Sequence, residues 1–215
     1  MNILAFDTSS EILAVGILRG DGEKASLAIE GIRHSETLIP TIEACLGKLG
    51  MTIGEVDLVG CALGPGSFMG LRIGIATAKG LSFALGKPWI GVPTLDAVAL
   101  AWDSRTCTVV PVLDARKNRV YAAIYRGARR CGDFLDCSIA DLLRRLEAED
   151  NVVFVGPDAD LLTEYCLERP GFSVEEDRPE ARALVLATLA GQRYASDGPS
   201  PEDMGPLYLR EPEIG

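Results

Sequence analysis

The sequence predicts an α/β fold built from two similar lobes, the second shorter than the first. Two apolar runs, NILAFD at 2–7 and TVVPVLD at 108–114, both end in an aspartate and are typical of buried strands. In each half, further strand-like runs and a helix follow, and a strand then leads into Gly64-Pro65 or Gly156-Pro157. The aspartate and the Gly-Pro pair are 57 residues apart in the first half and 42 in the second. Because the same order of elements appears twice, we expect a duplicated unit, although two unrelated α/β halves would give a similar pattern.

The first half predicts a hairpin and a helix after its first strand. Strand-like runs at 12–18 and 24–30 flank Gly20-Asp21-Gly22, which is a strong hairpin signal. Ser35 is placed to cap a helix over 36–49, which has one apolar face and ends at a glycine. That face consists of Leu38, Ile42, Leu46 and Leu49.

A glycine-rich loop joins a strand predicted over 57–63 to a second helix predicted over 70–85. Backbone N–H groups of such a loop could hold an anion at the start of the helix. No Lys-Ser/Thr pair closes the loop, and its GxGxxxG spacing differs from the dinucleotide fingerprint. The glycines equally suit a tight turn and close packing of a helix rich in small residues. The candidate phosphate-loop residues are Gly64, Gly66, Ser67 and Gly70.

Asp7-Thr8-Ser9 ends the first strand and gives a second candidate for phosphate binding. The carboxylate could hold a hydrated Mg²⁺ while the hydroxyl groups touch a phosphate, or the three residues could satisfy the amides of a turn. His34, the only histidine, precedes the first helix, where it would cap the chain or orient a partner. One histidine excludes a site with two, and no catalytic triad can be assembled around Ser67. We expect no metal site and no catalytic residue.

The second half predicts a paired strand over 119–125, a helix over 138–147 and a short strand over 151–155. The tail, 196–215, contains four prolines and cannot form a long helix, so we expect it to dock in an extended form. The expected lobes are residues 1–102, and residues 103–215 with the tail.

Composition narrows the class of protein. Of 215 residues, 47% are hydrophobic and 24% charged, which is ordinary for a globular chain. The net charge is −10, so we do not expect this chain to grip nucleic acid by itself. The six cysteines form no CxxC pair and the N-terminus has no basic signal region, which favours a reduced, cytoplasmic protein. No run of 18 apolar residues occurs, so we expect no membrane association.

Five segments are distinctive as a set. They are LAFDTSS at 4–10, His34-Ser35 with Leu38 and Pro40, GPGSFMGLRIGIATAKGLSFAL at 64–85, LDARKNRVYAAIY at 113–125 and PLYLR at 206–210. Together they resemble the bacterial TsaB family, also called YeaZ, over nearly the whole chain, and the glycine-loop block is the most specific of them. The chain departs from the family pattern at Met69, where threonine is usual, and at Val92-Pro93-Thr94-Leu95, where a serine pair usually precedes the leucine.

The resemblance implies the duplicated actin-like (ASKHA, RNase H-like) two-lobe fold, in agreement with the repeat described above. It implies a non-catalytic partner of TsaD, the enzyme that transfers threonylcarbamoyl from threonylcarbamoyl-adenylate to N6 of adenosine 37 in tRNAs reading ANN codons (t6A modification). TsaE, a small ATPase, joins the pair. The chain alone is then expected to bind no cofactor. ATP with Mg²⁺ and threonylcarbamoyl-adenylate would belong to the complex, whose other subunits hold most of the tRNA.

The resemblance also implies that the helix pair near 34–49 and 68–85 binds TsaD, and pairs with a second copy of the chain when TsaD is absent. Composition alone assigns the apolar face of these helices to the core. Under the resemblance, the contact residues are His34, Leu38, Ile42, Leu46, Leu71, Arg72, Ile75 and Lys79.

Two other functions stay open. A stand-alone actin-like ATPase or phosphotransferase would need a second phosphate loop, but the counterpart Asp114-Ala115-Arg116 lacks a glycine-rich anion nest. A peptidase is disfavoured by the single histidine and by the lack of a metal-binding motif.

Overall fold

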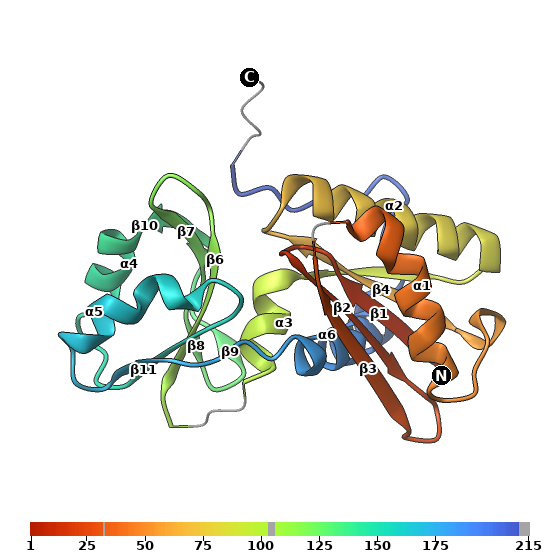
Figure 1. The fold of residues 1–215 in the computed structure, drawn as a ribbon, viewed down its shortest axis with the longest axis horizontal. Helices are drawn as coiled ribbons and strands as arrows, with labels where there is room; N and C mark the ends of the chain where they lie inside the picture. The colour runs from red at the N-terminus through yellow and green to blue at the C-terminus, as the bar shows by residue number, and fades with distance from the viewer. Residues whose placement is uncertain (32, 103–105, 211–215) are drawn as a thin grey trace. The chain divides into compact units, whose positions relative to one another are not determined.

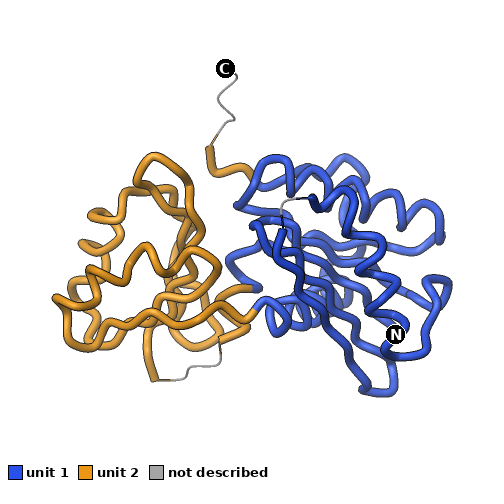
Figure 2. Tube along the Cα trace, in the orientation of Figure 1, with its two compact units in different colours: residues 1–97, 179–207 blue, residues 98–178, 208–215 orange. Residues whose placement is uncertain are grey.

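The computed structural model describes residues 1–31, 33–102 and 106–210, and it divides into two compact units (Figure 2). Unit 1 contains Met1–Ala97 and Pro179–Leu207, and unit 2 contains Val98–Arg178 and Tyr208–Gly215. Unit 1 is therefore made from both ends of the chain, and unit 2 is largely an insertion within it.

Unit 1 holds a mixed five-stranded sheet in the order β3-β2-β1-β4-β5 (Figure 1). Its first three strands are antiparallel neighbours, whereas β4 runs parallel to both β1 and β5. The strands are β1 (Ile3–Asp7), β2 (Ile12–Leu18), β3 (Lys24–Glu30), β4 (Leu58–Gly64) and β5 (Trp89–Pro93). The helices are α1 (His34–Gly47), η1 (Ile53–Glu55), α2 (Phe68–Leu85), α3 (Thr94–Leu100) and α6 (Pro179–Asp197).

Unit 2 repeats this topology in the order β10-β7-β6-β11-β12. As in unit 1, the first three are antiparallel neighbours and the last two run parallel to the central strand. The strands are β6 (Thr108–Asp114), β7 (Arg119–Ala122), β8 (Tyr125–Arg126), β9 (Arg129–Arg130), β10 (Leu135–Ser138), β11 (Val152–Val155) and β12 (Phe172–Val174). The helices are α4 (Ile139–Arg145), η2 (Ala159–Leu162) and α5 (Thr163–Leu167). The matching strand order confirms the predicted duplication.

Alternation along β1 builds two cores in unit 1. Leu4 and Phe6 pack into a cluster with apolar residues of α1 and α2, whereas Ile3 and Ala5 pack into a cluster with α6. Successive side chains of a strand point to opposite faces, so the sheet lies between α1 and α2 on one face and α6 on the other (Figure 1). A strand buried on both faces must be apolar throughout, which explains the uninterrupted run that the sequence shows.

The predicted lobes, 1–102 and 103–215, differ from these units because α6 returns to the first sheet. Its buried stripe, Ala183, Leu186, Ala187 and Ala190, has helical spacing and covers the β1 face that carries Ile3 and Ala5. A Cβ on Gly16 of β2 would lie 2.7 Å from the Ala183 backbone, so glycine there lets α6 approach the sheet closely.

The tail after α6 docks in an extended form, as predicted. Gly91 N donates to Ser200 Oγ at 2.9 Å and Leu207 N donates to Leu63 O at 2.8 Å. Residues 211–215, which the sequence also assigns to this tail, lie outside the described residues.

Some helix ends follow local signals, but α1 departs from the prediction at both ends, since it covers His34–Gly47 rather than 36–49. Ser67 caps α2 by accepting from Gly70 N, and Gly86 ends it with a left-handed φ of 63°. Ser138 caps α4 in the same way, through Asp141 N. The expected cap at Ser35 is wrong: α1 begins at His34, whose ring packs inward, so Ser35 lies within the first turn.

The packing of α6 on unit 1 predicts a large difference between two Leu→Ala variants. Leu186 is fully buried, and Leu186→Ala should lower the free energy of unfolding by about 2–5 kcal/mol through lost burial and a cavity. Leu167, which is 84% exposed in α5, is the matched control and should change it by less than about 0.5 kcal/mol. Urea denaturation measures both. Equal effects would contradict the placement of α6.

Candidate functional site

The two predicted phosphate-binding motifs meet at one edge of the unit 1 sheet. Asp7-Thr8-Ser9 follows β1, and the glycine loop follows β4, its parallel neighbour. Because parallel strands end at the same edge, the two turns lie against each other. Thr8 Oγ1 donates to Gly70 O at 2.8 Å, and Ser67 N donates to Ser9 O at 2.6 Å. The start of α2 is therefore bonded directly to the end of β1.

The glycines of this loop serve close packing. A Cβ on Gly70 would lie 1.9 Å from Thr8 O, one on Gly74 2.4 Å from Thr8 Oγ1, and one on Gly66 2.5 Å from Ser9 O. No real side chain fits at such distances. The interpretation of a tight turn with a closely packed helix is thus confirmed.

Asp7 is engaged by a buried arginine of α6. Arg182 Nε lies 3.0 Å from Asp7 Oδ2, and the two side chains are 1% and 0% exposed. The other carboxylate oxygen, Oδ1, accepts from Ser9 N at 2.8 Å. Sequence reasoning missed Arg182, because 175 residues separate it from Asp7 and only the return of α6 to unit 1 brings the two together.

This geometry does not fit a magnesium–nucleotide site. Mg²⁺ keeps most of its water and binds to carboxylates that solvent can reach. The Asp7 carboxylate is fully buried, and a guanidinium already neutralises it. We therefore derive no step of chemistry through a nucleotide at Asp7-Thr8-Ser9.

His34 holds the start of α1 against the turn after β1. The residue is only 5% exposed, and its Nε2 atom lies 2.7 Å from Ser10 O. The prediction of His34 as a partner contact is not supported, because its ring faces the interior of unit 1.

The predicted apolar contact residues face the wrong way for docking. All are at most 5% exposed and pack within unit 1, which corrects their assignment to a partner surface. They are Leu38, Ile42, Leu46, Leu71 and Ile75. Composition alone assigned this face to the core, and that interpretation was right. Lys79 is also engaged within unit 1, since Nζ donates to Glu202 O at 2.6 Å and lies over the Trp89 ring.

A different face of the same two helices is exposed. On α2, Phe83 is 91% exposed and Met69 is 64% exposed, and on α1, Ile39 is 44% exposed. Arg72, Ala76 and Gly80 are exposed between Met69 and Phe83 and continue the line at helical spacing. We call this surface the outer α1–α2 face: Ile39, Met69, Arg72, Ala76, Gly80 and Phe83. The sequence carries a signal for it, because α2 is apolar on both sides.

Comparison with known structures first defines the class. The (R)-2-hydroxyglutaryl-CoA dehydratase component A of Acidaminococcus fermentans matches with a TM-score of 0.60 at 12% identity, over 91% of this chain and 99% of that one. This likeness and the repeated topology show the duplicated actin-like (ASKHA) α/β fold. YeaZ from Pseudomonas aeruginosa matches more closely, with a TM-score of 0.80 at 26% identity over 97% of this chain and 99% of that one.

Comparison of sequences then gives the family. The tRNA threonylcarbamoyladenosine biosynthesis protein TsaB of Bacillus subtilis is 30% identical over 98% of this chain and 94% of its own length. A family model described as TsaD, tRNA N6-adenosine threonylcarbamoyltransferase, matches residues 29–169. The chain belongs to the TsaB (YeaZ) family, whose sequences also resemble the TsaD transferases.

Two glycines of α2 should respond in opposite ways to alanine. Gly70→Ala should destabilise the chain by about 1–3 kcal/mol, because its Cβ would overlap Thr8 O. Gly80→Ala is the matched control: nothing in the described chain lies within 4 Å of its Cβ position, so better helix propensity should stabilise by about 0.5–1 kcal/mol. Thermal and urea unfolding of the isolated chain measure both. A harmless Gly70→Ala would refute the packing interpretation.

Removing one member of the buried ion pair should be costly. Arg182→Met keeps most of the side-chain volume but leaves the Asp7 carboxylate buried without its cation, which should cost about 3–5 kcal/mol. Adding Asp7→Asn should recover part of the loss, because the buried negative charge is removed. Urea denaturation of the two variants and the parent measures the coupling. If the double variant is less stable than Arg182→Met alone, the two side chains do not act as a pair.

Proposed function

We propose that this chain takes part in t6A biosynthesis as a non-catalytic partner of a TsaD-type transferase, which it binds through the outer α1–α2 face. The observation that carries the proposal is the exposed apolar line on α2. Only 28% of this apolar helix is buried in the chain itself. Single exposed apolar residues are ordinary, but a row of them along one helix face, interrupted here at Arg72, is typical of a site of interaction.

The line on α2 has the properties of a helix-packing surface. Phe83 and Met69 offer large side chains toward its two ends, while Ala76 and Gly80 between them leave room for a neighbouring backbone. Glu36 and Glu43 on α1 are exposed beside it and would form part of a polar rim. A helix pair of this kind fits against a second helix pair.

A partner of related fold would present such a pair. The match of residues 29–169 to the TsaD family supports this, because that range contains α1 and α2. A second copy of this chain would offer the same surface, so we expect homodimers when the transferase is absent. TsaE would join the complex. Most of the tRNA would contact the partners, since this chain carries a net charge of −10.

A membrane is the other environment that an apolar helix could fit. By length and composition, α2 is the one helix among the described residues that could cross a bilayer, and a single such helix is weak evidence. Its inner face packs on the unit 1 sheet through Leu71 and Ile75, and Arg72 is charged and exposed on its outer face. A protein partner therefore fits α2 better than lipid.

The buried ion pair supports the proposed non-catalytic role. Arg182 neutralises Asp7, the carboxylate that an actin-like ATPase would use to hold Mg²⁺ near the phosphates. ATP with Mg²⁺ and threonylcarbamoyl-adenylate would then be bound elsewhere in the complex. The competing hypothesis, a stand-alone ATPase or phosphotransferase, predicts ATP hydrolysis by the isolated chain that Asp7→Ala abolishes in a variant that still folds.

Charge on the outer α1–α2 face should prevent complex formation. Phe83→Glu would bury a carboxylate against the partner, and we expect the dissociation constant to rise about 30-fold or more, as for a residue that dominates an interface. Size exclusion with light scattering, on the chain mixed with the TsaD-type transferase of its host, measures the loss. The variant should fold normally, because Phe83 is exposed.

Leu167→Glu is the matched control, an equally apolar and exposed position in unit 2, and it should leave the complex intact. Ile42→Glu is unsuitable, because Ile42 is buried and a charge there would unfold unit 1. The proposal would be contradicted if the parent chain does not bind the transferase. It would also be contradicted if the Phe83→Glu variant binds as well as the parent.

A further inference from the structure

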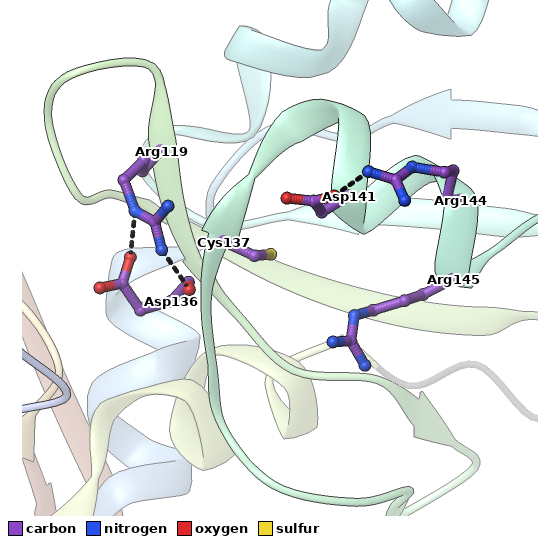
Figure 3. A pocket seen from close by; sticks show the side chains of 6 residues that line it. All are labelled: Arg119, Asp136, Cys137, Asp141, Arg144 and Arg145. Carbon is purple, nitrogen blue, oxygen red and sulfur yellow. Dashed lines mark hydrogen bonds and ion pairs between the residues drawn. The ribbon is translucent and has the colours of Figure 1, made fainter.

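Unit 2 contains a hollow of about 440 Å³ that is rich in arginine (Figure 3). It lies between β7, β10 and α4, and its lining is Arg119, Asp136, Cys137, Asp141, Arg144 and Arg145. Burial raises the pKa of the Cys137 thiol, so the sulfur stays neutral and the charged groups define the electrostatics of the hollow. We call this hollow the arginine pocket.

Both aspartates of the arginine pocket are already paired. Asp136 accepts from Arg119 Nε at 2.8 Å, and Arg210 of the tail binds both of its carboxylate oxygens at 2.8 and 2.9 Å. Burial alone would raise the pKa of the Asp136 carboxyl, but the hydrogen bonds from Arg210 and Arg119 outweigh it and hold the pKa below its ordinary value. Asp141 is bonded to Arg144 and to Ser138 Oγ. At neutral pH the lining carries three arginines and two aspartates, a net charge of +1, and Arg210, which is bonded to Asp136 but is not part of the lining, adds one further positive charge.

Arg145 differs from the other arginines. Across residues 106–210 and the described part of unit 1, no hydrogen bond or ion pair to its guanidinium occurs. In Figure 3 the Arg144 side chain turns toward Asp141, whereas Arg145 extends separately along the pocket. The pocket therefore combines arginines that the protein holds in place with one whose donors remain available.

The turn that carries Arg119 is unusual. Arg116, Lys117 and Asn118 have φ values of 62°, 55° and 57°, a left-handed conformation that costs non-glycine residues roughly 1–2 kcal/mol each. Asp114 Oδ1 accepts from Arg116 N at 2.7 Å and holds the turn in this form. The turn reverses the chain so that Arg119 enters β7 opposite Ser138 of the pairing strand β10, and its side chain reaches Asp136 two residues away on that strand.

We propose that the arginine pocket binds a phosphate group, supplied either by an RNA backbone or by a free nucleotide. A guanidinium presents planar paired donors that match phosphate oxygens, and a charged hydrogen bond to phosphate is among the strongest that proteins make. The whole chain has a net charge of −10 and therefore repels anions. The arginine pocket is positively charged, so it attracts an anion at this one place on the molecule. The RNA source rests on the function proposed above, whereas the phosphate chemistry does not.

The test compares Arg145→Gln with Arg129→Gln. Arg129 of β9 is also exposed and outside the pocket, with no ion pair in the described chain, so the two variants lose the same charge. The first probes are inorganic phosphate and AMP, and their binding is detected by the broadening of their phosphorus NMR signals. The second is a labelled anticodon stem–loop RNA, followed by fluorescence anisotropy over a range of salt concentrations.

We expect the parent and Arg129→Gln to bind, and Arg145→Gln to lose at least about fivefold in affinity for the probe concerned. With RNA as the source, Arg145→Gln should also lower the salt dependence by about one phosphate contact. An effect on AMP and phosphate without an effect on RNA assigns the pocket to a free nucleotide. A parent that binds none of these probes overturns the proposal, as do equal effects of the two variants.

The same variants separate this inference from the proposed function. Arg145→Gln should still form a complex with the transferase, because Arg145 is in unit 2 and the outer α1–α2 face is in unit 1. If the parent forms no such complex but Arg145→Gln still loses phosphate binding, the proposed function fails and the phosphate site stands.

Discussion

The buried pair of Asp7 and Arg182 connects the first strand of the chain to its last helix. Unit 1 is interrupted by the residues that form unit 2, so its two segments must find each other across a long stretch of chain. Apolar packing of α6 supplies most of the attraction, but it is not directional. A buried arginine tolerates few positions, because it needs its carboxylate partner, and this requirement fixes how α6 lies on the sheet. The same contact places a guanidinium against the Asp7 carboxylate, away from solvent.

Much of the fold could be predicted from local patterns. The two strands that end in aspartate, the Gly-Pro pairs and the proline-rich tail each depend on neighbouring residues, and the strand order repeats as expected. The sheet against which α6 packs could not be predicted. Its stripe of alanine and leucine would suit either sheet, and the features that decide between them, Gly16 opposite Ala183 and Asp7 opposite Arg182, are distant in the sequence.

The candidate site was harder to predict than the fold, for a physical reason. Helix α2 is apolar on both sides, so periodicity does not tell which side faces the sheet and which faces a partner. Leu71 and Ile75 belong to the inner side, whereas Met69 and Phe83 belong to the outer one. The substitution of methionine at position 69 fits this outer side, where a long apolar side chain adds contact area and no internal hydrogen bond needs a hydroxyl group.

The glycine loop shows why resemblance to a nucleotide-binding fold does not establish nucleotide binding. A loop between a parallel strand and a helix is a natural place for an anion, and the actin-like fold provides it. Here a Cβ on Gly66 or Gly70 would overlap the backbone oxygen of Ser9 or Thr8, so the glycines are needed for packing whether or not a ligand binds. In this chain the hydrogen bonds between the loop and the end of β1 fix the direction in which α2 leaves the sheet. The direction of α2 determines where Met69 and Phe83 lie. The packing of the glycine loop therefore also positions the surface that we propose for docking.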